Sequence, residues 1–208
     1  MQELASGLWR WTGRHPEWKQ EVGSIYVEAD GGVCLIDPLV PPEDSERFWA
    51  ALDRDVARAG GPVDILITLF WHTRNAGEVA ERYDARVWAP SRARKAVERR
   101  AGRAPETLRP GDALPGGIEA FATGRSTEVV YWLPGHRALV PGDVVLGADR
   151  GGLRLCPESW LPEGVGHAEV REAMRPLLDL PVSRVLVSHG EPVLNGARTA
   201  LRRALHGG

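Results

Sequence analysis

Residues 63–77 read VDILITLFWHTRNAG, and this stretch decides the fold of the chain. Residues 63–68 are mainly apolar or β-branched, which predicts a buried strand. A polar loop follows, and residues 76–83 have the pattern of a short helix. The same order returns with a strand at 86–89 and a basic helix, capped by Ser91, that extends to residue 100. Alternating strands and helices predict a sheet covered by helices.

The rest of the chain extends this pattern in both directions. A hairpin precedes it, and a helix that follows Ser45 carries an apolar side chain every fourth residue until Gly60. The second half repeats the layout without a tandem repeat or a long linker. We therefore expect one domain over residues 1–208, with an α+β fold built as a four-layer αββα sandwich. The other predicted elements are hairpin strands at 22–28 and 33–36 with their turn at 29–32, strands at 118–122, 128–133, 138–140 and 184–187, a loop that opens at Gly142, a helix at 167–180 and a last helix ending near 205.

Composition excludes several classes of protein. The chain has 208 residues, of which 26 are basic and 28 acidic, and 43% are hydrophobic. This balance argues against a disordered chain and against a basic protein that coats nucleic acid. Two cysteines far apart in sequence build neither a disulfide framework nor a four-thiolate zinc site. The N-terminus lacks the features of a secretory signal, and no window has the length and apolarity of a membrane span. We expect a cytoplasmic protein with no nucleic-acid or membrane partner.

Short motifs at the ends of the predicted strands resemble those of a known family. They are LIDP at 35–38, the stretch 64–77, Gly124, PGD at 141–143 and VSHGEP at 187–192. In this order and spacing they are similar to the metallo-β-lactamase superfamily, which includes glyoxalase II and many other hydrolases. The resemblance covers residues 8–205 and implies the αββα sandwich.

The chain departs from that family at the metal ligands. Members usually end the strand equivalent to 63–68 with T-H-x-H-x-D-H, whose imidazole and carboxylate groups hold one or two zinc ions. Alignment on Asp64 and Gly77 without gaps puts the four ligand positions at Phe70, His72, Arg74 and Asn75. Alignment on Thr68 instead puts them at residues 69, 71, 73 and 74. At most one of the four ligands is retained.

The later ligand positions are mixed. Arg125 stands where the family has a histidine, and a guanidinium has no lone pair for a metal ion. Asp143 matches the bridging aspartate, and His189 matches the final histidine. We therefore expect no paired metal ions. Our hypothesis is that Arg74 or Arg125 replaces the lost cations, pairs with Asp143 and binds an anionic group of a small ligand.

Three functions remain open. The first is a metal-independent hydrolase of esters, thioesters or lactams, in which His72 or His189 is the general base and Asp143 orients it. The second is a non-catalytic module that binds a small molecule or a partner. The third is a hydrolase in which His72, Asp143 and His189 hold a single zinc or iron ion. By analogy with the family, a homodimer is expected.

Two further residues, Trp71 and Asn75, belong to the predicted ligand site. Trp71 is expected to form an apolar wall of the pocket. Asn75 is a candidate ligand-binding residue, but with Glu78 it also fits a helix N-cap with its capping box. Local structural roles likewise remain open for the charged residues and histidines of the site, since these types often stabilise turns or face solvent.

Overall fold

The computed structural model describes residues 1–29 and 31–206, and its larger sheet has seven strands in chain order. β1 to β4 are antiparallel neighbours, whereas β4 to β7 run parallel. Parallel neighbours need a crossover, and a helix lies between each pair. The strands are β1 (Gln2–Ala5), β2 (Leu8–Arg14), β3 (Glu21–Ala29), β4 (Gly32–Ile36), β5 (Val63–Leu66), β6 (Arg86–Pro90) and β7 (Glu106–Leu108); the helices are α1 (Ser45–Ala59), α2 (Ala76–Tyr83) and α3 (Arg94–Ala101).

The second half of the chain forms a four-stranded sheet in the order β13-β10-β9-β8. β8, β9 and β10 are antiparallel, and β13 joins β10 in parallel. A separate hairpin of β11 and β12 follows β10. The elements are β8 (Glu119–Ala122), β9 (Val129–Leu133), β10 (Ala138–Val140), β11 (Val145–Ala148), β12 (Gly152–Leu155), β13 (Arg184–Val185), α4 (His167–Met174) and α5 (Ala197–His206).

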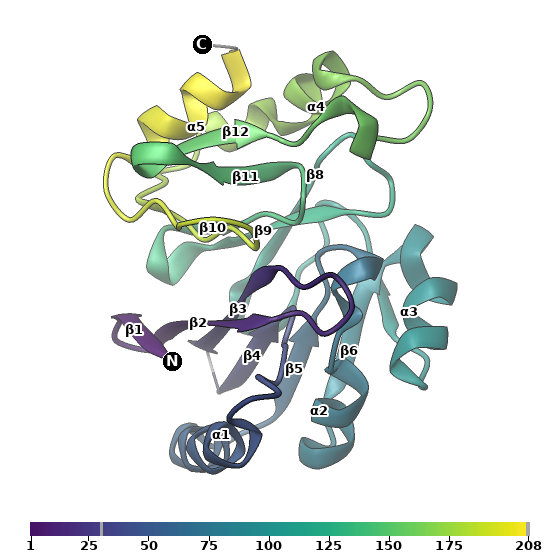
Figure 1. Ribbon diagram of the computed structural model, residues 1–208, viewed down its shortest axis with the longest axis vertical. Helices are drawn as coiled ribbons and strands as arrows, with labels where there is room; N and C mark the ends of the chain where they lie inside the picture. Colours follow the sequence, from purple (N-terminus) through teal and green to yellow (C-terminus); the bar gives the residue numbers. More distant parts are fainter. Residues whose placement is uncertain (30, 207–208) are drawn as a thin grey trace.

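Alternation along the strands builds the layers of the sandwich. Leu35 and Ile65 face α1, α2 and α3 in one core, whereas Ile36 points to the other side and packs with Tyr131 of β9 between the two sheets. On the far side of the second sheet, Trp132 packs in a third core with α4 and α5. Figure 1 shows α1 and α2 below the larger sheet and α4 and α5 at the opposite end. The αββα sandwich is confirmed.

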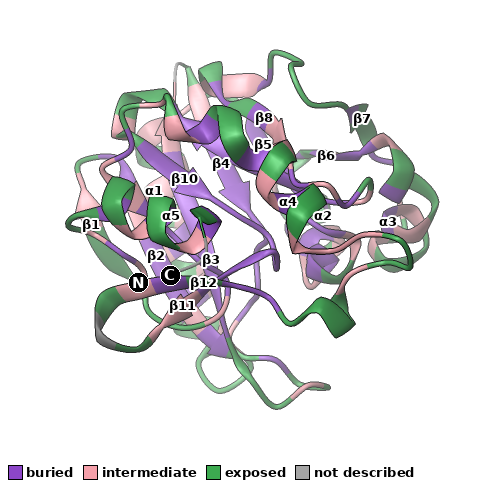
Figure 2. Ribbon diagram, turned by 90° about the horizontal axis from the view of Figure 1, so that it is seen from above, coloured by how far each residue is buried: buried purple, intermediate pink, exposed green. Residues whose placement is uncertain are grey.

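Burial follows this layering. In Figure 2 the central strands are mostly buried, while α1 and α2 present exposed outer faces. This is the pattern expected when each sheet buries both faces, one against the other sheet and one against helices.

Several details differ from the sequence-based prediction. β1, β2 and β7 were not predicted, and the loop predicted to open at Gly142 contains the β11–β12 hairpin. The helix predicted to reach residue 180 ends at Met174 and continues as a 3₁₀ turn, because Pro176 has no backbone N–H for the next helical bond. The predicted turn at 29–32 includes Asp30, which lies outside the described residues. Among the described helices, none has the length and apolarity needed to cross a bilayer.

Candidate functional site

Polar side chains gather where strands of both sheets end. Asp37 follows β4 and His72 lies in the short 3₁₀ turn (Phe70–Thr73) after β5. Asp143 follows β10, and His189 follows β13. β4 and β5 are parallel, as are β10 and β13, so each pair has its carboxyl ends on one side, and the contact of His72 with Asp143 brings these two sides together.

His72 lies between two carboxylates. Its side chain is 0% exposed, and its Nδ1 lies 2.9 Å from Asp37 Oδ2 and 3.0 Å from Thr68 Oγ1. Its Nε2 lies 3.0 Å from Asp143 Oδ1. Burial works to lower the pKa of His72, but the charges of Asp143 and Asp37 outweigh it and raise that pKa to about 9. The two carboxylates therefore favour the protonated form of the imidazole that lies between them.

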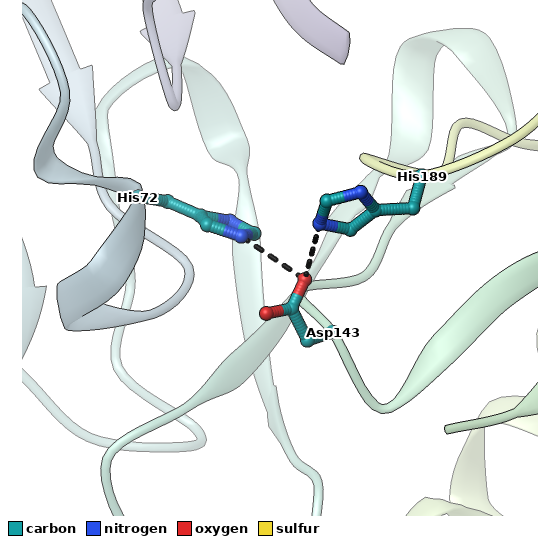
Figure 3. A group of neighbouring side chains, drawn as sticks. All are labelled: His72, Asp143 and His189. Carbon is teal, nitrogen blue, oxygen red and sulfur yellow. Dashed lines mark ion pairs between the residues drawn. The ribbon is translucent and has the colours of Figure 1, made fainter. Parts of the chain in front are cut away.

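Asp143 also meets His189. The Oδ1 atom that faces His72 lies 3.3 Å from His189 Nε2, and Figure 3 shows both rings directed at this one oxygen. Burial works to raise the pKa of Asp143, but the two histidines reverse this and hold it well below its usual range. His72 Nε2 and Asp143 Oδ1 are buried, yet their approach lacks hydrogen-bond alignment. Together with one His189 nitrogen, the donor atoms lie within 4.8 Å of one another.

His189 is accessible through a pocket with aromatic walls. The pocket has a volume of about 270 Å³ and is lined by His189, Asp143, Gln20 and three tryptophans, Trp18, Trp71 and Trp160. Trp71 and Trp160 are each 45% exposed, which is unusual for large apolar side chains. Trp71 thus lies on a wall of this pocket.

The loop that carries His189 is held by backbone contacts. Gly23 N–H of β3 donates to Ser188 O at 2.7 Å, and Gly147 N–H of β11 donates to His189 O at 2.9 Å. Gly190 has φ +84°, and a Cβ there would lie 3.1 Å from Gly147 Cα. Glycine meets both requirements at this position.

Arg74 does not pair with Asp143, contrary to our hypothesis. Its Nη1 donates to Gly23 O and Asp37 O, both at 2.8 Å, and its Nη2 donates to Ser188 Oγ at 2.7 Å. The guanidinium therefore joins β3, the end of β4 and the loop beside His189. Its fork of donors suits this three-way link. Arg74 is not part of the lining of the pocket at His189, but it lines the hollow beside it.

Arg125 also has protein partners other than Asp143. It is 7% exposed, its Nη1 lies 3.0 Å from Glu128 Oε2, and its Nη2 donates to Trp160 O. Glu128 Oε1 in turn accepts the Val144 N–H at 2.9 Å. Burial raises the pKa of Glu128 to about 7, although Arg125 opposes the shift. Arg125 therefore supports the residues that follow Asp143 and the segment that carries Trp160.

Asn75 occupies the N-cap position of α2, as expected, but its side chain makes no bond to the helix backbone. Its Oδ1 accepts the Val40 N–H at 3.0 Å, and its Nδ2 donates to Glu78 Oε2 at 2.9 Å. The side chain lines a neighbouring hollow that shares Trp18 and Trp71 with the pocket at His189. The predicted capping box is wrong, because the Glu78 carboxylate binds the Asn75 side chain and not its backbone.

Sequence reasoning missed three supports of the site. Asp37 was noted only as part of a motif, and its bonds to Thr68 and His72 show that it orients the buried ring. Glu128 had no sequence signal, because its role depends on its closeness to Gly142 across two strands. Arg10 Nη2 donates to Gly190 O at 3.1 Å, which supports the loop of His189 from β2.

Comparison with solved structures identifies the fold. The DIM-1 metallo-β-lactamase superposes with a TM-score of 0.73 at 15% identity, covering 98% of this chain and 95% of that one. The chain has the metallo-β-lactamase fold. A metallo-β-lactamase from Pontibacter korlensis has a TM-score of 0.71 at 18% identity, with 100% and 98% covered. A β-lactamase domain protein from Burkholderia ambifaria has a TM-score of 0.68 at 19% identity, with 97% and 70% covered. No family model and no curated protein matches the sequence.

Within the metallo-β-lactamase fold, three of the candidate residues come together in space and four do not join them. His72, Asp143 and His189 form the cluster of Figure 3. Trp71 flanks it, whereas Arg74, Arg125 and Asn75 are bonded to backbone and side-chain groups around it.

Proposed function

We propose that this protein is a hydrolase that works without paired metal ions, with His189 as its general base and Asp143 as the group that orients the base. The contact of 3.3 Å between Asp143 Oδ1 and His189 Nε2, in the lining of the tryptophan-walled pocket, carries the proposal. A carboxylate behind an imidazole that faces an accessible pocket is the arrangement that general-base catalysis needs.

Each residue then has a defined role. His189 turns its Nε2 towards Asp143 Oδ1 at 3.3 Å, which leaves Nδ1 as the ring nitrogen to take a proton from an attacking water. Asp143 stabilises the imidazolium that forms. His72 is less suited to be the base, because it is fully buried and both of its nitrogens face carboxylates. Its charge offsets that of Asp143 and Asp37.

The surroundings also favour chemistry without a metal pair. Arg74 and Arg125 stand at two of the family's ligand positions, and guanidinium groups repel cations and offer them no lone pair. Both side chains are bonded to protein groups, and neither lines the pocket at His189, whose apolar walls are tryptophan side chains. We therefore propose an ester, thioester or lactam substrate with an apolar or aromatic group beside the scissile bond, in place of the anionic ligand first expected.

Turnover by chelator-treated protein tests the proposal. The substrates are aryl and alkyl esters, a thioester and a lactam, and aryl esters should be turned over best. His189→Ala should lower kcat by a factor of about 10²–10⁴, the usual contribution of a general base. His206→Ala, at the exposed end of α5, is the matched control and should retain wild-type turnover.

Two outcomes would contradict this proposal. Equal turnover by His189→Ala and wild type would show that another group is the base. Absence of turnover on every substrate, with folding intact, would leave the non-catalytic binding module.

A second candidate, a hydrolase with one metal ion, is favoured by the convergence of His72 Nε2, Asp143 Oδ1 and His189 within 4.8 Å. Two imidazoles and a carboxylate fit zinc in donor type, and two of these donors are buried without a hydrogen bond. The Asp37 carboxylate would fix the His72 ring in the way that outer carboxylates orient metal-bound histidines. A zinc ion here would supply a more acidic bound water.

Metal analysis separates the two candidates. If the second is right, protein purified without added metal contains stoichiometric zinc or iron, Asp143→Asn loses it, and chelation abolishes turnover. If the first is right, turnover survives chelation, and added zinc does not increase it.

A further inference from the structure

We propose that a small organic anion bearing phosphate or carboxylate groups binds in a second cavity, which lies between the carboxyl ends of β6 and β7 and the turn that joins β8 to β9. This cavity has a volume of about 830 Å³, compared with about 270 Å³ for the pocket at His189. Pockets for small organic ligands usually fall between about 300 and 1,000 Å³. The proposal is independent of the hydrolase proposed above.

The walls of this cavity come from both sheets. Ser91 and Arg92 follow β6, Arg109 follows β7, and Arg125 and Ser126 lie in the turn between β8 and β9. β6 and β7 are parallel, so their carboxyl ends open at the same edge. Ligands of parallel α/β sheets characteristically bind outside this edge, between neighbouring elements.

The charge of the lining is positive. Arg92, Arg109 and Arg125 line the cavity with a single carboxylate, that of Glu128, which is fully buried and paired with Arg125. In the described parts of the chain, no ion pair involves the side chain of Arg92 or of Arg109, and both residues are exposed. Two guanidinium groups therefore remain for an anion.

Arg125 supplies the buried part of this charge. Its side chain is 7% exposed, and its Nε–H is buried with no partner among the described residues. The protein thus leaves one of its five donors unsatisfied, while the hydroxyls of Ser91 and Ser126 lie in the same lining. Planar guanidinium forks together with hydroxyls are the groups that recognise phosphate and carboxylate oxygens.

The second cavity is separate from the pocket at His189. The lining of each contains no residue of the other among the described residues, and the Arg125–Glu128 pair lies between the cavity and the loop of Asp143. The arginine first expected to bind an anion beside Asp143 therefore faces this cavity.

Titration calorimetry with pyrophosphate and with citrate tests the proposal. At least one of them should bind wild-type protein in a 1:1 ratio. Arg92→Ala/Arg109→Ala should weaken that binding about tenfold or more, because charge-assisted bonds are lost. Arg125 is kept, since its removal would leave Glu128 buried and unpaired. The matched control is Arg94→Ala/Arg99→Ala, which removes the same charge from the exposed face of α3 and should bind within about twofold of wild type.

Amide chemical shifts locate the bound anion. The same titration followed by NMR should move the amide signals of residues 124–126, and the preferred probe tells phosphate from carboxylate recognition. Binding by neither probe would overturn the proposal. Equal weakening in both double variants, or shifts confined to other surfaces, would show only general attraction between charges and would overturn it as well.

Discussion

Glu128 is a fully buried carboxyl group whose ionisation the fold resists. Its carboxylate braces the loop of Asp143 through the Val144 N–H, and its countercharge is Arg125 at 3.0 Å. Burial raises its pKa from an ordinary value near 4.5 to about 7. The folded protein therefore holds this proton more tightly than the unfolded chain does.

The pH dependence of stability follows from that difference. Because the pKa is raised in the folded state, the contribution of Glu128 to stability is greatest below about pH 4.5 and is lost as pH rises towards about 7. Glu128→Gln should remove this slope, which amounts to about 3 kcal/mol over the window. Urea unfolding at several pH values measures it. Glu163→Gln, in an exposed loop, is the control, and an identical slope in both variants would contradict the prediction.

His72 shows how much of a residue's surroundings its sequence leaves open. As a lone histidine after a strand it was a candidate base. The structure gives it a carboxylate beside each ring nitrogen and no exposure, which makes it less suited to be the base than His189. Sequence alone did not reveal this, because Asp37 lies on another strand and Asp143 in the other half of the chain.

At the scale of elements, the turn from β10 to β11 determines where Asp143 points. Gly142 packs against Glu128 so closely that a Cβ would lie 2.4 Å from Glu128 Oε1. The backbone before Asp143 therefore packs directly against the side chain of Glu128, the residue before β9.

Gly142→Ala should consequently displace this turn. We expect a loss of about 1–3 kcal/mol from overpacking and a fall in turnover, since the Asp143 carboxylate would shift relative to His189. Thermal unfolding and kinetics measure the two effects. Gly135→Ala, in the turn between β9 and β10 with no atom within 4 Å of the added Cβ, should change neither. Similar effects of both substitutions would show that the contact with Glu128 is unimportant.

At the scale of the whole molecule, the site lies where the two sheets meet, and arginine side chains connect them there. Arg74 joins β3 and the end of β4 to Ser188, and Arg10 reaches from β2 to Gly190. The position of His189 relative to His72 thus depends on bonds between residues more than 100 positions apart.

Replacing Arg74 tests this connection. Arg74→Lys keeps the charge but loses the fork, so we expect a loss of about 1–3 kcal/mol of stability. If Arg74 positions His189, kcat should fall while KM stays near its wild-type value. Arg82→Lys, in an exposed pair with Asp53, should cost less than about 1 kcal/mol and leave kcat unchanged. A rise in KM without a change in kcat would argue against a positioning role.

Local patterns in the sequence determined most of the fold. Apolar alternation located the strands of both sheets, and apolar periodicity located the helices, because these signals depend only on neighbouring residues. β1 and β2 at one side of the larger sheet, β7 at its other edge and the β11–β12 hairpin escaped prediction. Motif order determined that His72, Asp143 and His189 would share one edge, since strand ends of a layered fold converge there.

Only the tertiary structure decided what the charged residues of that edge do. Whether Arg74 and Arg125 face a ligand or the protein depends on which backbone carbonyls and carboxylates lie within about 3 Å of a guanidinium. Those partners come from β3, the residue after β4, the residue before β9 and the loop after β13. Electrostatic and hydrogen-bonding energies depend on distance in space, so residues remote in the chain set them, and no local sequence pattern encodes them.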